Sequence, residues 1–204
     1  MIHSMMSKTH ITVGVASSLA VCHPTTWEGI FAAIIGGAAG GILCDIDCRS
    51  TRGMRDALWG RLIVLGLCTL ILIADCLMKA GIWVSILSQS TYKLILGCVV
   101  LVITCLIGAF CEHRTFTHSL LFCALITFGF YCITPLLLIP VVIGGLSHLI
   151  IDTLNKKPIP WLFPLHEGFC LKLCYANSVA NTVFMWAGLA VCIALLIWRI
   201  TFIT

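Results

Sequence analysis

The stretch WEGIFAAIIGGAAGGILC, residues 27–44, is followed directly by Asp45-Ile46-Asp47 and carries no charge after Glu28. An apolar run of roughly 20 residues is long enough to cross a bilayer as a helix. Its glycines recur at four-residue spacing, at positions 36, 37, 40 and 41, which lets another helix approach closely. We therefore predict a tightly packed membrane helix that ends at a pair of carboxylates.

The composition extends this prediction to the whole chain. Of the 204 residues, 60% are hydrophobic and only 10% are charged, with a mean hydropathy of +1.11. These values lie far outside the range of water-soluble domains. No hydrophilic stretch is long enough to fold separately, so we predict one integral membrane domain over residues 1–204. The net charge of +4 forms no basic run, which gives no support for nucleic-acid binding.

Apolar segments predict the fold class, an all-α polytopic transmembrane bundle of six to seven segments. The first segment is short, and we expect it either to cross the bilayer or to dip in and return. The segments are 9–22, 27–44, 58–78, 92–111, 116–134, 136–152 and 178–200.

Lysine and arginine predict the orientation, because cytoplasmic loops carry an excess of both. If the loop after residue 44 is cytoplasmic, only Lys79, Lys93 and Arg199 fall on the other side. The remaining basic residues then lie inside, namely Lys8, Arg49, Arg52, Arg55, Arg61, Arg114, Lys156, Lys157 and Lys172.

The beginning of the chain resembles a short signal sequence, since Lys8 is followed by an apolar run and Cys22. A single lysine is a weak basic region, and Val21 is bulky for the position before a lipoprotein cysteine. We expect the segment to be retained, because His10 can join the polar residues described next.

Ionisable residues gather at the predicted cytoplasmic ends of the segments, where such groups are costly and usually functional. His148 and Asp152 lie four residues apart, so both project from one helix face and could bind one metal ion. A structural hydrogen-bonded pair is the alternative for these two residues alone. Four aligned groups favour a metal site, with zinc as the leading ion and manganese or iron as alternatives. The groups are His10; Asp45 and Asp47; Glu112, His113 and His118; His148 and Asp152.

The 13 cysteines lie mostly inside apolar runs and include no C-x-x-C pair, so they predict neither a disulfide framework nor a zinc ribbon. Cys44, Cys48 and Cys111 flank the polar groups and are further candidates for metal binding. His3 and His23 are left out of the site, whereas His166 could be a peripheral site residue.

Three blocks together resemble the YdjM-like family of bacterial inner-membrane proteins, which are assigned as metal-dependent hydrolases. They are Asp45-Ile46-Asp47, His113-Arg114-Thr115-Phe116-Thr117-His118-Ser119, and Gly145-Leu146-Ser147-His148-Leu149-Ile150-Ile151-Asp152 with the following 158–164 segment. The resemblance runs from His10 to about Pro164 and implies a multi-pass inner-membrane location. The family pattern has histidine after Asp-Ile-Asp, where this chain has Cys48, so either that position is not an essential ligand or a thiolate replaces it.

The order of these residues is also similar to that in zinc-dependent phospholipase C and S1/P1-type nucleases. This looser likeness implies phosphoester hydrolysis at a cluster of metal ions. The implied ligands are His10, Asp45, Asp47, His113, His118, His148 and Asp152.

These observations predict a membrane hydrolase that uses metal-activated water at the cytoplasmic face. Asp45 or Asp47 would bind metal and act as the base, and Arg114 would bind a phosphate oxygen or simply anchor the loop. The expected substrate is a phospholipid, an isoprenoid phosphate or another amphiphile. The alternatives are a membrane transport or metal-handling protein and a non-catalytic scaffold. Transport would favour ionisable residues at mid-membrane on several helices, whereas Asp75 lies close to the far face and no other acid penetrates deeply. The oligomeric state stays open.

Overall fold

The computed structural model describes residues 7–48, 51–165, 167–173 and 179–201, except for the side chains of residues 51–53. His3, Arg49, His166 and the Arg52 side chain, which entered the sequence predictions, lie outside this description. The described residues form helices and connecting loops without a strand, and one isolated antiparallel bridge joins Ile159 and Phe169, which confirms the predicted all-α class.

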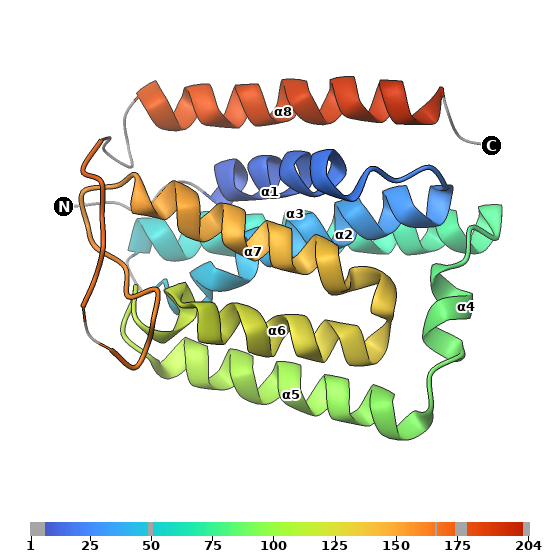
Figure 1. The fold of residues 1–204 in the computed structure, drawn as a ribbon, viewed down its shortest axis with the longest axis horizontal. Coiled ribbons are helices and arrows are strands. Elements are labelled where there is room, and N and C mark those ends of the chain that lie inside the picture. The colour runs from blue at the N-terminus through green and yellow to red at the C-terminus, as the bar shows by residue number, and fades with distance from the viewer. Residues whose placement is uncertain (1–6, 49–50, 166, 174–178, 202–204) are drawn as a thin grey trace.

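Eight α-helices and three short 3-10 turns follow one another along the described chain (Figure 1). They are α1 (Ser7–Cys22), α2 (Trp27–Leu43), η1 (Cys44–Asp47), α3 (Thr51–Met78), α4 (Ile82–Leu87), α5 (Thr91–Phe110), η2 (Phe116–His118), α6 (Leu120–Ile133), η3 (Pro135–Leu137), α7 (Leu138–Thr153) and α8 (Val179–Ile200).

Five of these segments are long and apolar enough to cross a membrane: Trp27–Asp47, Met54–Met78, Thr91–Phe110, Pro135–Thr153 and Val179–Ile200. Helix α1, with 16 residues, and α6, with 14, are shorter. At 1.5 Å per residue each is about 21–24 Å long, less than the roughly 30 Å of hydrocarbon in a bilayer. The prediction that the first segment is short agrees with this length.

Two helices begin more than two residues away from the predicted segments, and one helix was not predicted. Helix α6 begins at Leu120 instead of residue 116, because Phe116–His118 forms its own turn and the Ser119 hydroxyl caps α6 by accepting from Phe122 N. Helix α3 begins at Thr51, before its apolar run. Helix α4 has only six residues, too few for a hydropathy pattern to indicate it.

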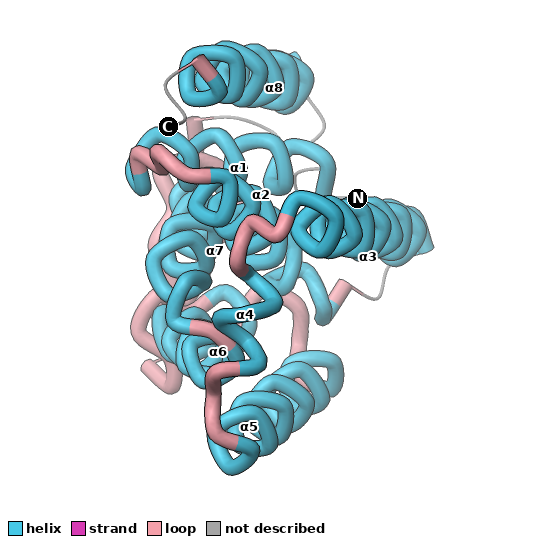
Figure 2. The backbone as a smooth tube through the Cα atoms, turned by 90° about the vertical axis from the view of Figure 1, so that its right-hand side faces the viewer, coloured by secondary structure: helices cyan, strands magenta, loops and turns pink. Residues whose placement is uncertain are grey.

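The bundle has buried helices at its centre and helices with exposed apolar faces around them. Figure 2 shows α8, α3 and α5 on separate sides of the bundle, around α1, α2 and α7. Within its candidate span α2 is 78% buried inside the protein, compared with 17% for each of the three peripheral helices. The outward residues of these peripheral helices are apolar, such as Leu77 with 80% exposure. This arrangement fits a bundle whose outer helices face lipid.

The glycines of α2 bring its neighbours into backbone contact, as their spacing predicted. A Cβ on Gly41 would lie 2.5 Å from the His10 carbonyl oxygen in α1, and one on Gly40 would lie 2.5 Å from the Val141 carbonyl oxygen in α7. Real Cβ atoms essentially never come that close. Helix α2 therefore packs closely between α1 and α7. These two helices carry two of the four predicted polar groups.

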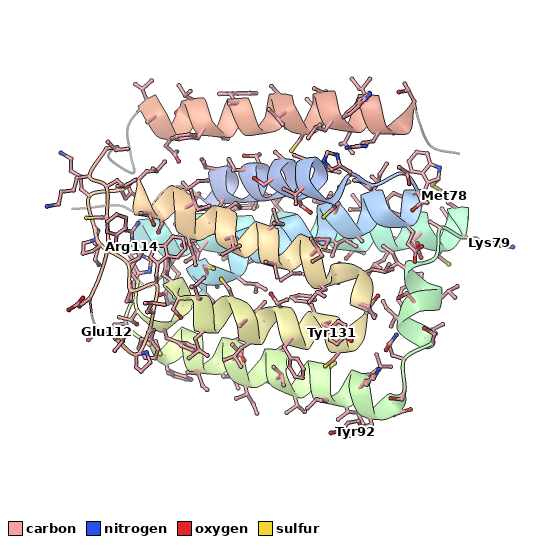
Figure 3. All side chains as sticks on the ribbon, in the orientation of Figure 1. Met78, Lys79, Tyr92, Glu112, Arg114 and Tyr131 are labelled. Carbon is pink, nitrogen blue, oxygen red and sulfur yellow. The ribbon has the colours of Figure 1, made fainter. Side chains whose placement is uncertain are left out.

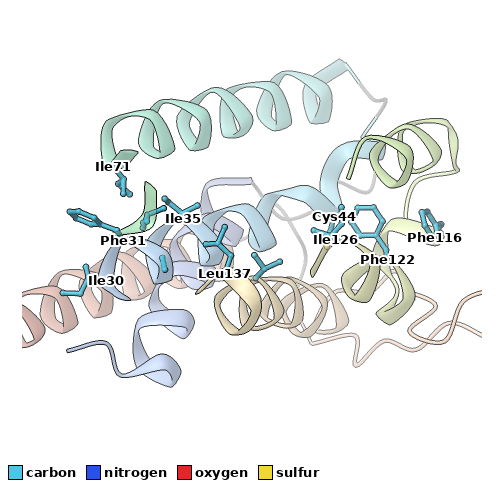
Figure 4. Packing of buried hydrophobic residues seen from close by; sticks show 12 residues of the cluster. Ile30, Phe31, Ile35, Cys44, Ile71, Phe116, Phe122, Ile126 and Leu137 are labelled. Atoms are coloured by element: carbon cyan, nitrogen blue, oxygen red, sulfur yellow. The ribbon is translucent and has the colours of Figure 1, made fainter. Parts of the chain in front are cut away.

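Apolar side chains from several helices fill the space beside α2 (Figure 4). Phe116 and Phe122 meet edge to face with ring centroids 5.4 Å apart, next to the polar end of the bundle. Cys44 is 1% exposed within this same cluster. It therefore packs as a small apolar side chain.

Asp75 caps helix α4 at the other end of the bundle. Its carboxylate oxygens accept hydrogen bonds from the backbone N–H groups of Gly81, Ile82 and Trp83, at 3.0, 2.9 and 3.0 Å. The Asp75 side chain is only 1% exposed, so its carboxylate is shielded from water.

We expect Asp75→Ala to lower the free energy of unfolding by about 1–3 kcal/mol, because three backbone N–H groups, of which that of Ile82 is buried, lose their acceptor. Thermal unfolding in detergent, followed by helical circular dichroism, measures this. Glu167→Ala is the control, since Glu167 is exposed. Equal unfolding temperatures for the two variants would contradict the capping role.

Candidate metal centre

All four predicted polar groups converge at one end of the bundle, on the left in Figure 1. Helix α1 brings His10, η1 brings Asp45 and Asp47, the connection between α5 and α6 brings His113 and His118, and α7 brings His148 and Asp152. Figure 3 shows Arg114 and Glu112 at this end, and Lys79 and Tyr92 at the other.

The centre of the cluster is withdrawn from solvent. His10, His118, His148 and Asp152 are 0% exposed and Asp45 is 1% exposed. His118 Nε2 lies 3.3 Å from His148 Nε2 and 3.3 Å from Asp152 Oδ2. Asp45 Oδ1 lies 3.9 Å from both of these Nε2 atoms. We call these five residues the buried cluster.

The hydrogen bonds around His118 and His148 determine where their protons lie. His148 Nδ1 is 2.8 Å from the Gly41 carbonyl oxygen, which can only accept, so Nδ1 carries the proton. The Thr117 hydroxyl donates to Asp47 Oδ2 at 2.5 Å and so accepts from His118 Nδ1 at 2.9 Å. Burial also lowers the pKa of His118, which favours the neutral ring. Both Nε2 atoms therefore point lone pairs at each other.

A cation between the two nitrogens would offset the repulsion between facing lone pairs. Two nitrogens bound at about 2.0–2.1 Å to a tetrahedral zinc ion are about 3.3–3.4 Å apart, close to the distance between the two Nε2 atoms. An outer hydrogen bond from Nδ1 to a carbonyl or hydroxyl is also how metal-bound histidines are held. The arrangement of His118 and His148 thus fits a pair of metal ligands.

His10 supports the same interpretation independently. Its ring stacks on that of His148, with centroids 3.8 Å apart, and its Nε2 lies 3.6 Å from Asp152 Oδ1. Both ring nitrogens are buried without a hydrogen-bond partner. Leaving such a group unsatisfied costs about 1–3 kcal/mol, and a metal ion bound to Nε2 would satisfy one nitrogen.

Asp47 and Arg114 hold the centre together from outside the buried cluster. Asp47 accepts from His113 Nδ1 at 2.8 Å, from Arg114 N at 3.0 Å and from the Thr117 hydroxyl. Arg114 adopts a positive φ of 67°, which turns its N–H toward Asp47. Its guanidinium lies 2.9 Å from Asp152 Oδ2 and donates to the Lys157 carbonyl oxygen at 3.0 Å.

Comparison with known protein families adds one finding: the family model described as "YdjM inner membrane protein" matches residues 5–204. The chain belongs to this family. Curated proteins and solved structures give no match.

In this YdjM family member, three groups among the described residues have ligand atoms close enough to hold a metal ion. In each group these atoms lie within 4.8 Å of one another. The groups are His10, His148 and Asp152; Asp45, His118 and His148; and Asp47, Cys48 and His113.

The structure places the other sequence candidates in different surroundings. Cys48 joins the third group, whereas Cys44 lies in the apolar core and Cys111 is absent from all three groups. His23 contacts Arg199, near the C-terminal end of α8, and so lies away from the site as predicted. The role of Arg114 toward a phosphate oxygen stays a prediction, because its described hydrogen bonds run to the protein.

Sequence reasoning missed two groups that orient the histidines of this YdjM family chain. Thr117 lies inside the block 113–119, and its place beside His118 could have indicated a supporting hydroxyl. The Gly41 carbonyl has no side-chain signal at all. Its contact with His148 arises only because α2 and α7 pack backbone to backbone.

Proposed function

We propose that this chain is a metal-dependent hydrolase that cleaves a phosphoester of an amphiphilic substrate at the membrane surface. The observation that carries the proposal is the 3.3 Å distance between His118 Nε2 and His148 Nε2, beside the buried carboxylates of Asp45 and Asp152. The outer hydrogen bonds of both rings leave these two nitrogens without a proton. Such a cluster is costly to fold without a cation, and its donor set of histidine and aspartate suits zinc.

The five residues of the buried cluster are the proposed ligands, and Asp47 and Arg114 support them from outside it. His10, His118, His148, Asp45 and Asp152 would hold the metal, which when bound supplies a Lewis acid and lowers the pKa of a water molecule. Asp45 is the better base of the two predicted carboxylates. Its Oδ1 faces the histidines and Cys48, whereas Asp47 already accepts three hydrogen bonds from the 113–117 loop. Arg114 positions Asp152.

The chain segment that follows α7 supports an amphiphilic substrate. Two hydrogen bonds hold its backbone at the site end of the bundle. Leu120 N donates to the Trp161 carbonyl oxygen, and the Arg114 guanidinium donates to the Lys157 carbonyl oxygen. Exposed apolar and basic side chains together suit the headgroup level of an anionic bilayer. They are Leu162, Leu165, Phe169, Leu171 and Leu173, with Lys156, Lys157 and Lys172.

A transport function would favour ionisable groups spread across the bundle. Among the described residues, the buried carboxylate nearest the other end is Asp75. It caps α4 by accepting hydrogen bonds from backbone N–H groups at the start of that helix. The clustering at one end therefore favours an enzyme over an ion path.

The proposal includes a cytoplasmic site, which follows from the distribution of basic residues. An epitope inserted beside Lys156 or beside Lys79 in the full chain tests this. In intact spheroplasts we expect antibody to reach the epitope at Lys79 and not the one at Lys156. The reverse pattern would place the site on the outer face.

The function itself is tested by incubating the protein, reconstituted in lipid vesicles, with a panel of phosphorylated lipids and following release of phosphate or headgroup. We expect release that a chelator abolishes and added zinc restores, and that His148→Ala lacks. His23→Ala is the matched control and should keep full activity. Bound metal without release from any substrate would favour a metal-handling protein, and absence of bound metal would favour a scaffold.

A further inference from the structure

Beside the buried cluster lies a second set of potential ligands with a different chemistry. Cys48 Sγ is 3.7 Å from Asp45 Oδ1, and it lies 3.8 Å from Nδ1 and 4.0 Å from Nε2 of His113. We propose that Cys48 and His113 form a second cation position, joined to the buried cluster by Asp45. The inference deepens the proposed function, on which it rests, by making the centre binuclear with one thiolate-containing position.

The orientation of His113 supports a ligand role. Its Nδ1 lies 2.8 Å from Asp47 Oδ1, so Nδ1–H donates a hydrogen bond to that carboxylate and the lone pair is on Nε2. A carboxylate that holds the far nitrogen of a histidine is the usual support of a metal ligand. Asp47 therefore supports one histidine of each position. It contacts His113 directly, and it contacts His118 through the Thr117 hydroxyl.

Asp45 is placed to connect the two positions. Its Oδ1 lies 3.9 Å from Nε2 of both His118 and His148, and 3.7 Å from Cys48 Sγ. Arg61 donates to its backbone carbonyl oxygen at 2.9 Å, which anchors the residue and leaves the carboxylate available. A single carboxylate oxygen can bind two cations at once, and Oδ1 is the atom that faces both positions.

The two positions differ in the exposure of their histidines and in the softness of their ligand atoms. The His113 side chain is 27% exposed, whereas the histidines of the buried cluster are 0% exposed. A position with two protein ligands and a bridging carboxylate keeps room for water or substrate. A thiolate ligand favours zinc or another soft cation over magnesium or calcium. The second position is thus the more open and the more readily exchanged.

Cobalt(II) provides the test, because a cysteine thiolate bound to cobalt gives a charge-transfer absorption in the near ultraviolet that nitrogen and oxygen ligands do not. We expect the metal-free protein in detergent to take up two equivalents of cobalt and to show this band. Cys48→Ser should take up one equivalent without the band. Cys48→His should take up two equivalents, also without the band. Cys111→Ser, a half-buried neighbour, is the control and should behave as the wild type.

The outcomes separate this inference from the proposed function. Wild-type protein that binds one equivalent without a thiolate band overturns the second position and leaves the buried cluster intact. A band that persists in Cys48→Ser also overturns it. If the wild type binds no cobalt, both the inference and the proposed function fail.

Discussion

Replacing His148 by alanine is expected to remove bound metal and hydrolysis together. His148 Nε2 lies 3.3 Å from His118 Nε2 and 3.9 Å from Asp45 Oδ1. The substitution therefore removes a proposed metal ligand from the centre of the buried cluster. Loss of an outer hydrogen-bond partner alone costs roughly 10–100-fold in metal affinity. We expect His148→Ala to lose more than that, and Asp152→Ala to do the same.

The control for this prediction must separate lost ligation from lost folding. Truncating one member of a buried hydrogen-bonded pair costs about 1–3 kcal/mol even where no metal binds. Metal content per chain is therefore measured on protein that elutes as a folded species in size-exclusion chromatography. His23→Ala changes a histidine at the other end of the bundle and should keep its metal. Folded His148→Ala with full metal occupancy and full hydrolysis would refute the site.

Replacing Gly41 by valine is expected to damage both packing and metal binding. A Cβ at this position would lie 2.5 Å from the His10 carbonyl oxygen, so α1 must move away from α2. Overpacking of this kind costs about 1–3 kcal/mol. The movement also separates His10 from His148, whose rings are stacked 3.8 Å apart, and shifts the Gly41 carbonyl that holds His148 Nδ1.

Gly66→Val is the matched control, because nothing lies within 4 Å of a Cβ at Gly66 in the exposed face of α3. Thermal unfolding and metal titration are measured on both variants. We expect Gly41→Val to unfold at a lower temperature and bind metal more weakly, while Gly66→Val resembles the wild type. Equal behaviour of the two variants would show that backbone contact between α1 and α2 does not position the site.

Hydrophobic runs predicted most of the fold, because membrane helices need long apolar stretches. The glycines of 27–44 also indicated close packing, which the contacts of Gly40 and Gly41 confirm. Helix α4 escaped prediction because its six residues, Ile82–Leu87, are fewer than two turns. Its start depends on Asp75, whose capping bonds reach six to eight residues along the chain.

The convergence of the polar groups was predictable from topology, since His10, Asp45, His118 and His148 were all expected at one membrane face. Their individual contacts were not. The lone pair of His148 points inward because its other nitrogen meets a backbone carbonyl of α2, and no residue pattern encodes that contact. The sequence likewise did not indicate that the Arg114 guanidinium lies 2.9 Å from Asp152 Oδ2.

The most direct test of a metal ion held by the buried cluster is X-ray absorption spectroscopy of the zinc-loaded wild-type protein in lipid, after dialysis against metal-free buffer. The account predicts zinc retained in the buried cluster, with nitrogen and oxygen ligands at about 2.0–2.2 Å and the multiple-scattering pattern of histidine rings. Zinc that dialysis leaves at Cys48 would add sulfur at about 2.3 Å. A spectrum without histidine scattering, or zinc that dialysis removes completely, would contradict the account.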